Sequence, residues 1–318
     1  MKAKLLKIIA LLSVIAICVA MIVAYILLGQ SAKQVKSLKR QNFQLLSHIA
    51  SLTTGKTLET IKEEQSLYRR DFISHKDSLP DSYVLSPPLI PPDDGKYTLV
   101  VYLHGMGANY LEPYYVPKKE PIVPRIQEAF PSLIVASLSY GKQSAWMSEK
   151  AIADIDQNIA ELTYAYPIHD IVLMGTSMGG CTALYYSTAA PDAIKKRIKG
   201  VVSVEGAGDL KTLFSATKAT LVKFGIANAL GGTPEQVPQV YERTSFLNHI
   251  DKLPVTTRFA IVSAKRDSTV PPGLQVDVKE ALEKQGNPTR FLTVESGHEL
   301  PPPEVYVDGL RYVLGNEK

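Results

Sequence analysis

The sequence predicts an α/β fold built on a mostly parallel sheet, with helices on both faces and a small helical cap. Three observations support this prediction. Short apolar runs recur across residues 97–294 and alternate with stretches of helical pattern. These runs are apolar at consecutive positions, which is typical of strands buried on both faces of a parallel sheet. The segment Gly-Thr-Ser-Met-Gly-Gly at residues 175–180 lies between one such strand and a helix-forming stretch.

The elements follow one another along the body of the chain, and one segment interrupts the alternation. Residues 207–250 have a helical pattern and contain Gly-Gly-Thr-Pro, so we expect them to form the cap. The expected strands are residues 83–86, 97–103, 133–137, 169–174, 201–204, 258–263 and 290–294, and the expected helices include residues 144–166 and 181–187.

The N-terminus predicts a membrane anchor. Residues 8–28 form a run of 21 residues without a charge, which as a helix could cross a bilayer core of about 30 Å. A cleaved signal peptide is the alternative, with Cys-Val-Ala at residues 18–20 as its cleavage site. Because the apolar run continues past Ala20, we expect an uncleaved signal anchor in a single-pass membrane protein. Basic residues flank the run on both sides, so their charges hardly favour one orientation in the membrane. The order of a short basic start followed by an apolar run is typical of secreted proteins and favours an α/β domain outside the cytoplasm.

The predicted domain organisation has three parts: a transmembrane signal anchor at residues 1–30, a helical juxtamembrane stalk and linker at residues 31–80, and the α/β domain at residues 81–318. Apolar residues at heptad spacing over residues 35–52 suggest a weak homodimer through this stalk. An amphipathic helix that lies on the body or on lipid is an equally good interpretation. Residues 56–78 are mixed and charged, and we expect a helical linker there.

The distribution of charge and the number of cysteines indicate which kinds of molecule the chain could bind and whether it forms disulfides. Residues 1–80 hold 12 Lys and Arg against 5 Asp and Glu, whereas the remainder holds 23 against 26. The basic excess therefore belongs to the N-terminal arm, which fits a membrane-proximal segment better than a nucleic-acid surface, and no nucleic-acid motif is present. Cys18 and Cys181 lie far apart and imply no disulfide framework.

Ser177 is the candidate nucleophile. It occupies the centre of a Gly-x-Ser-x-Gly motif between a buried strand and a helix, the context in which this motif forms a sharp turn that exposes the serine hydroxyl. The turn strains the serine backbone, and the helix N-terminus supplies partial positive charge. A structural tight turn is the alternative interpretation.

A serine hydroxyl needs a neighbouring base, and histidine is the usual one. Among the six histidines, His298 lies in a loop directly after the last expected strand, so we expect it to be the base. A surface-loop histidine is the alternative. His104 opens a glycine-rich loop and should brace that turn instead.

The acid that orients the histidine should follow the preceding strand. Asp267 lies at the carboxyl end of the strand at residues 258–263, where sheet enzymes place their chemistry. Glu205, which ends the strand before that, is the main rival. Asp209 is expected to be a helix N-cap.

Negative charge that develops on a substrate oxygen requires fixed N–H donors. We expect one oxyanion donor to be the backbone N–H of Met178, which follows the nucleophile, and the other to be that of Met106 in the His-Gly-Met-Gly loop. Gly107 is the alternative for the second donor. Trp146 and Tyr140 could line a substrate pocket, although such aromatics are more often part of the core.

These motifs, in this order, resemble those of the α/β-hydrolase superfamily over about residues 95–315. Within it the chain is similar to prolyl-oligopeptidase-like and dienelactone-hydrolase-like esterases, and residues 231–245 echo a segment that such proteins carry before the acid strand. The resemblance implies a catalytic triad of Ser177, Asp267 and His298, with no metal and no cofactor. Thr176 departs from the family, where His, Glu or Trp is common, and no propeller repeat is present.

The sequence therefore predicts a membrane-anchored serine hydrolase, most simply a carboxylic ester hydrolase that forms an acyl-enzyme on a small ester or acyl substrate. A serine peptidase or an acyltransferase on the same fold is one alternative. A non-catalytic, membrane-tethered binding module is the other, and the complete triad argues against it.

Overall fold

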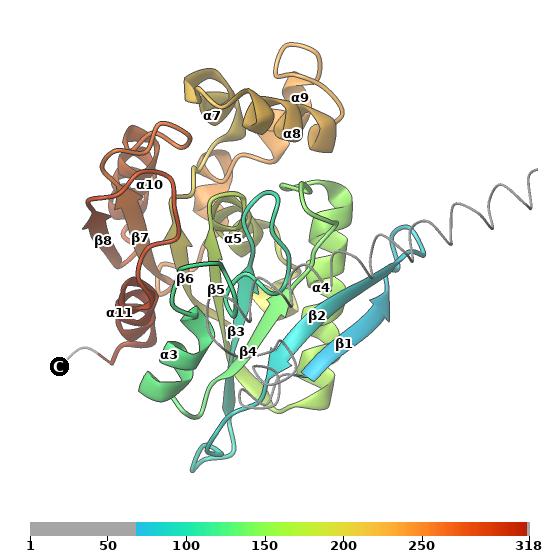
Figure 1. Cartoon of the computed structure of the whole chain (residues 1–318), viewed down its shortest axis with the longest axis vertical. Helices are drawn as coiled ribbons and strands as arrows, with labels where there is room; N and C mark the ends of the chain where they lie inside the picture. Colours follow the sequence, from blue (N-terminus) through green and yellow to red (C-terminus); the bar gives the residue numbers. More distant parts are fainter. Residues whose placement is uncertain (1–67, 317–318) are drawn as a thin grey trace, which may run out of the picture. The chain divides into compact units, whose positions relative to one another are not determined.

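A computed structural model describes residues 68–316, which lie within one compact unit (Figure 1). Its centre is an eight-stranded sheet with the strand order β1-β2-β4-β3-β5-β6-β7-β8. β1 and β2 pair antiparallel, as do β2 and β4, and every other pairing is parallel. The strands are β1 (Tyr68–Ile73), β2 (Pro80–Ser86), β3 (Tyr97–Leu103), β4 (Ile134–Leu138), β5 (Ile168–Thr176), β6 (Ile198–Val204), β7 (Arg258–Ala264) and β8 (Thr289–Val294).

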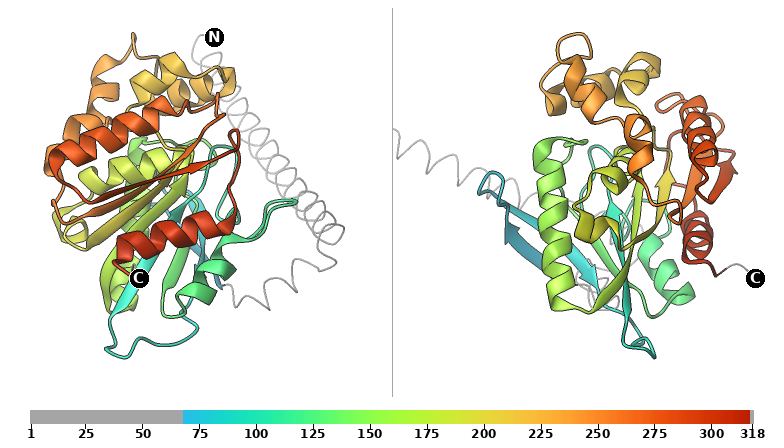
Figure 2. Two further views of the ribbon diagram at one scale, coloured as in Figure 1. Left: turned by 90° about the vertical axis from the view of Figure 1, so that its left-hand side faces the viewer. Right: turned by 180° about the vertical axis from the view of Figure 1, so that it is seen from behind.

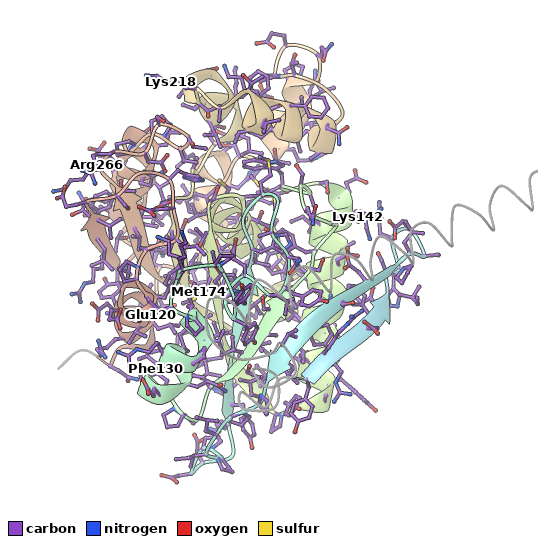
Figure 3. The ribbon with its side chains drawn as sticks, viewed as in Figure 1. Glu120, Phe130, Lys142, Met174, Lys218 and Arg266 are labelled. Carbon is purple, nitrogen blue, oxygen red and sulfur yellow. The ribbon has the colours of Figure 1, made fainter. Side chains whose placement is uncertain are left out.

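The central strands are buried on both faces, as their continuous apolar sequences predict. Val101 of β3 pairs with Ala136 of β4 on one side and Leu173 of β5 on the other, and all three are fully buried. Figure 3 shows Met174 of β5 among the packed side chains of the interior, whereas Lys218 and Arg266 lie at the outer edge. The seven expected strands are all present, each within three residues of its expected bounds.

Helices cover the two faces of the sheet and form two separate apolar clusters (Figure 2). The cluster on one face includes residues of α4, α5 and α10, and the cluster on the other includes residues of α3 and α11. Ser148 caps α4 by accepting a hydrogen bond from the N–H of Ala151, so this helix begins later than expected from the sequence. The bounds are α3 (Ile122–Ala129), α4 (Glu149–Ala165), α5 (Met178–Ala189), α6 (Asp192–Lys195), α10 (Gly273–Gln285) and α11 (Pro303–Leu314).

The segment between β6 and β7 is helical, as the interrupted alternation indicates. It holds α7 (Leu210–Ala216), α8 (Thr220–Leu230), α9 (Pro238–Arg243) and the 3-10 helix η1 (Leu247–Lys252). In Figure 1, α7, α8 and α9 form a group at the top, above the sheet. Asp209 is the N-cap of α7, as expected, and accepts a hydrogen bond from the N–H of Thr212.

The domain begins earlier than the sequence indicates. Residues 68–73 form the edge strand β1 and pair with β2, so the expected linker helix over residues 56–78 and the boundary at residue 81 are wrong in this part. Phe72 alone of the β1 side chains is buried, and the charged residues around it resemble a solvated linker in the sequence. The anchor at residues 1–30 and the heptad segment at residues 35–52 lie outside the described residues. Within residues 68–316 no helix is long and apolar enough to cross a bilayer.

Candidate active site

Ser177 occupies a sharp turn between β5 and α5. Its φ of 55° and ψ of −117° lie in a strained region for a residue with a side chain. The turn is tightly packed: a Cβ atom on Gly179 would lie 1.9 Å from the carbonyl oxygen of Leu103. Only glycine allows the helix and β3 to approach so closely, and this contact fixes the position of the serine hydroxyl.

The structure brings Ser177, His298 and Asp267 together in one hydrogen-bonded row. His298 Nε2 lies 2.9 Å from Ser177 Oγ, and His298 Nδ1 lies 2.7 Å from Asp267 Oδ2. In the neutral imidazole this arrangement requires that the serine hydroxyl donates to Nε2 and that the Nδ1–H donates to the carboxylate. The three residues come from the ends of β5, β7 and β8, which meet at the same edge of the parallel sheet.

The Asp267 carboxylate is held from two directions. Its Oδ1 accepts hydrogen bonds from the backbone N–H groups of Thr269, at 2.7 Å, and Val270, at 2.9 Å, while Oδ2 faces the imidazole. Its side chain is fully buried. Because these hydrogen bonds fix the carboxyl group in one orientation, Asp267 is well placed to hold the imidazole in the required tautomer.

Glu205, the rival acid of the sequence analysis, also reaches His298. It follows β6, is 1% exposed, and its Oε2 lies 3.1 Å from His298 Nδ1. Burial raises the pKa of Glu205, and hydrogen bonds from His298 and from the backbone N–H of Glu299 only partly offset this effect. The structure thus places both candidate carboxylates beside one ring nitrogen, with Asp267 the closer.

The two carboxylates set the charge state of the imidazole. Burial by itself would lower the pKa of His298, but hydrogen bonds and attraction from Asp267 and Glu205 outweigh it and raise the pKa to about 9. The protonated imidazole is therefore favoured at neutral pH in the free site.

The loop that follows β3 contains one N–H, that of Met106, at the pocket beside the nucleophile. The Gly107 N–H donates to the carbonyl of Gln143 at 2.7 Å, and the Gly105 N–H donates to Glu112 Oε2 at 3.1 Å. Within the described part of the chain, the N–H groups of Met106 and Met178 have no such partner. This rules out Gly107 as a free donor and leaves the two expected residues available.

Glu112 is a site residue that sequence reasoning missed. Its carboxylate accepts hydrogen bonds from Gly105 N–H and from the hydroxyl of Tyr102, at 2.8 Å, and so braces the loop from behind. Burial raises the pKa of Glu112 to about 7, against the lowering effect of these hydrogen bonds. It lies in an irregular stretch after the glycine loop, and no local pattern indicates that its side chain folds back.

Tyr140 and Trp146 do not line the site, because both are fully buried in the core. The Tyr140 hydroxyl donates to the carbonyl of His104, whose own Nδ1 lies 2.8 Å from the Gly105 carbonyl oxygen. Burial lowers the pKa of His104 to about 4, which keeps this imidazole neutral. His104 therefore braces the turn, as the sequence analysis expected.

A small pocket of about 170 Å³ opens at Ser177. The side chain of Met106, which lines it, also contacts the cap: a Cβ atom on Gly225 of α8 would lie 2.8 Å from the Met106 sulfur. The cap therefore packs directly against the loop that carries the candidate donor. The pocket lining comprises Gly105, Met106, Glu112, Thr176, Ser177, Glu205, His298, Glu299 and Leu300.

Glu205, Asp267 and His298 form a cluster whose potential ligand atoms lie within 4.8 Å of one another. Carboxylate and imidazole groups can bind a divalent metal. Here, however, both ring nitrogens of His298 already face protein partners, Ser177 on one side and the carboxylates on the other. The cluster is therefore better described as a serine-imidazole-carboxylate arrangement than as a metal centre.

The strand order, the strained turn at Ser177 and the row of three side chains define the class of the protein as an α/β-hydrolase-type fold with a Ser-His-Asp arrangement. The profile of the prolyl oligopeptidase family matches residues 153–314, which is half of the chain. The chain belongs to this family. A search of curated proteins found no match.

Similar solved structures include a puromycin hydrolase, with 21% sequence identity and a TM-score of 0.61 over 78% of this chain. The acylaminoacyl peptidase of Pyrococcus horikoshii is 15% identical, with a TM-score of 0.58 over 79% of this chain. This chain covers 39% and 41% of these two proteins, respectively. A ferulic acid esterase is 14% identical, with a TM-score of 0.54 over 77% of this chain, and 94% of that protein is covered. At such identities the likeness concerns the fold.

Proposed function

We propose that the protein is a serine hydrolase that cleaves carboxylic esters through an acyl-enzyme. The observation that carries this proposal is the position of the His298 imidazole, 2.9 Å from the Ser177 hydroxyl and 2.7 Å from the Asp267 carboxylate. This geometry allows the imidazole to accept the hydroxyl proton while the carboxylate keeps its orientation.

In the proposed reaction, Ser177 Oγ attacks the acyl carbon and its proton passes to His298 Nε2. The N–H groups of Met106 and Met178 stabilise the negative charge that develops on the substrate oxygen. The imidazolium then gives its proton to the leaving alcohol, and the acyl–oxygen bond of the ester breaks. Water, deprotonated by the same nitrogen, hydrolyses the acyl-enzyme and restores the serine. Each proton that His298 accepts, first from Ser177 and then from water, is returned to the leaving alcohol and to the serine, respectively, so the reaction needs no further acid or base.

The choice of an ester is supported by one structural neighbour of the same fold, a ferulic acid esterase. The small pocket at Ser177 is also more suited to a short acyl group than to an extended peptide.

The first test is labelling and turnover of the full-length protein and its Ser177→Ala variant. We expect a fluorophosphonate probe to label the wild-type protein and not the variant, and the hydrolysis of p-nitrophenyl acetate to fall by about 10⁴-fold or more. Ser215→Ala, which removes an exposed serine of α7, is the control and should behave as wild type. A Ser177→Ala variant with undiminished turnover would refute the assignment.

Peptidase activity is the second candidate, because the family and two of the structural neighbours favour it. Comparison of kcat/KM for matched ester and amide substrates with the same acyl group distinguishes the two. Acyl transfer is distinguished by adding an acceptor alcohol and measuring the ratio of new ester to free acid. A larger specificity constant for the amide would replace the esterase proposal with the peptidase.

We also propose that residues 8–28 anchor the protein in a membrane with the α/β domain outside the cytoplasm. The uncharged length of this segment supports the anchor, and the secretory-type layout of a short basic start followed by an apolar run supports the side. Membrane fractionation after carbonate extraction tests the anchor, and protease accessibility in intact cells tests the side. A weak homodimer through residues 35–52 is tested by crosslinking of the full chain in detergent.

A further inference from the structure

Two neighbouring parallel strands deliver a carboxylate to the same ring nitrogen. Asp267 follows β7 and Glu205 follows β6, and these strands pair in register up to Val204 and Val262. The carboxylate oxygens lie 2.7 Å and 3.1 Å, respectively, from His298 Nδ1. A triad of the ordinary kind needs one such carboxylate, so the second requires an explanation.

The two carboxylates differ in what else holds them. Asp267 accepts two backbone N–H groups of its own loop, at Thr269 and Val270. The Glu205 carboxylate is buried, and its partners are the His298 ring nitrogen, 3.1 Å from Oε2, and the backbone N–H of Glu299. A buried carboxylate is costly unless it is paired, and of these two partners only the imidazole can carry a charge, so the imidazole is its counter-group.

The backbone at Glu205 is strained in a way that directs this side chain. Its φ is +52°, a region that favours glycine, and its N–H is fixed by a hydrogen bond to the carbonyl of Val262 at 2.8 Å. Gly206, the next residue, packs against the turn at the start of α5, where a Cβ atom would lie 2.6 Å from the carbonyl carbon of Gly180. A glycine at position 205 would avoid the strain, and the glutamate instead places a negative charge at the imidazole.

Other charged groups near His298 do not duplicate this role. Glu112 lines the same pocket, but its oxygens are engaged with Gly105 and Tyr102. Glu299 is exposed and forms an ion pair with Lys119. Arg266 precedes Asp267 and is directed to the backbone carbonyl of Glu295. Within the described residues, Glu205 and Asp267 are the carboxylates within 4 Å of the imidazole nitrogens.

We propose that Glu205 is a second positioning residue for the triad imidazole: it shares the Nδ1–H of His298 with Asp267 and takes over its orientation when the Asp267 charge is removed. This inference rests on the proposed hydrolase function. In the reaction, the serine proton moves to Nε2 and the Nδ1 proton stays on the ring. Glu205 receives no proton. It supplies a second negative charge that stabilises the imidazolium while the tetrahedral intermediate exists.

The test combines two isosteric substitutions, Glu205→Gln and Asp267→Asn, singly and together, in the full-length protein. We expect Asp267→Asn alone to lower kcat/KM for p-nitrophenyl acetate by about 100-fold. In a triad with a single acid, the same change lowers the rate by about 10⁴-fold. Addition of Glu205→Gln to Asp267→Asn should lower it by about a further 100-fold. Glu205→Gln alone should change kcat by less than about tenfold and lower the midpoint of the acidic limb of kcat/KM by about one pH unit or more.

The imidazole itself gives a readout that requires no substrate. In protein labelled with ¹⁵N-histidine, the pH midpoint of the His298 ring should fall in Glu205→Gln by the same amount as the kinetic midpoint. Glu205→Gly, which relieves the backbone strain, should fold at least as well and show the same shift. The control for general charge effects is Glu295→Gln. It removes an exposed carboxylate that follows β8, as His298 does, and that pairs with Lys265.

Two results would overturn the inference while leaving the hydrolase assignment intact. One is a loss in Asp267→Asn equal to that in the double variant. The other is an unchanged His298 midpoint in both Glu205→Gln and Glu205→Gly. The hydrolase assignment is judged separately in the same samples by fluorophosphonate labelling of Ser177, so failure of one is not confused with failure of the other.

Discussion

Two loops flank the nucleophile, and each contains or contacts a buried carboxylate that accepts backbone N–H groups. In the loop at residues 264–270, here called the acid loop, Asp267 accepts from Thr269 and Val270 and presents its other oxygen to His298. At the loop formed by residues 104–107, here called the oxyanion loop, Glu112 accepts from Gly105 and makes no contact with His298.

The difference shows that the same chemical group serves two purposes. The acid loop uses its backbone to fix a carboxylate that contacts the base. The oxyanion loop uses a carboxylate to fix a backbone, so that the next N–H, on Met106, remains available. In the proposed reaction, the first loop would control proton transfer and its pH dependence, while the second would control stabilisation of charge on the substrate oxygen.

The largest effect is expected where the oxyanion loop loses its donor. Met106→Pro removes the N–H, and we expect kcat for p-nitrophenyl acetate to fall by about 10²–10³-fold with a small change in KM. Met106→Leu keeps the N–H and should lose far less. Equal losses in the two variants would mean that the side chain packed on α8, and not the donor, is what matters.

The acid loop is expected to give the wild-type protein an alkaline pH profile. Because the pKa of His298 is raised to about 9, the imidazole is mostly protonated at pH 7 and cannot accept the serine proton. We expect kcat/KM to rise about tenfold per pH unit between pH 6.5 and 8 and less steeply above pH 8, with a total rise of about 50-fold from pH 7 to 9. A plateau already reached at pH 7 would contradict the charge balance described for this loop.

The same pKa has a consequence for stability, with a definite sign. The folded-state pKa of about 9 lies above the ordinary histidine value of 6.5, so the stabilisation from this group is fully present below pH 6.5. It is lost as the pH rises through 9. The pH range of highest activity is therefore the range in which this contribution to stability disappears.

A smaller effect on rate is expected from Glu112→Gln, which removes the charge behind the oxyanion loop. The hydrogen bonds from Gly105 and Tyr102 then go to a neutral amide, and we expect kcat to fall by about tenfold. The wild-type protein should also lose about 3 kcal/mol of stability as the pH rises from 4.5 through 7, because the buried carboxyl group, with a pKa of about 7, must ionise.

Urea unfolding between pH 4.5 and 8 measures this second effect. The Glu112→Gln variant should show a flatter dependence than wild type, while Glu128→Gln, an exposed carboxylate paired with Arg125, should follow the wild-type curve. A parallel pH dependence in wild type and Glu112→Gln would show that Glu112 is ionised throughout, and that its role behind the loop is weaker than the geometry indicates.

Most of the sheet could be predicted because its strands are continuous apolar runs bounded by glycine and proline. Strand β1 was missed because an edge strand with one buried side chain, Phe72, carries little hydrophobic pattern. Ser177, Asp267 and His298 could be placed because each follows a recognisable strand, and parallel strands end at one edge of the sheet.

The remaining site residues depend on contacts that are not local in the sequence. Glu112 reaches Gly105 from an irregular loop, and nothing in the intervening residues indicates this return. Glu205 could be named as a rival acid from its position after a strand, but not as a simultaneous neighbour of His298. That outcome depends on a positive φ and on the approach of Gly206 to α5, which only the folded backbone reveals.

Cys181 lies on α5 behind the nucleophile, fully buried, with its sulfur accepting the N–H of Ala207 at 3.1 Å. Burial raises the pKa of its thiol to about 12, so thiolate is scarce at any working pH. We therefore expect alkylating reagents not to modify Cys181 in the folded domain. A cysteine introduced at an exposed position of α8, such as Phe224, would be the reactive thiol of the described domain, and a fluorophore attached to it would test whether the cap moves during turnover.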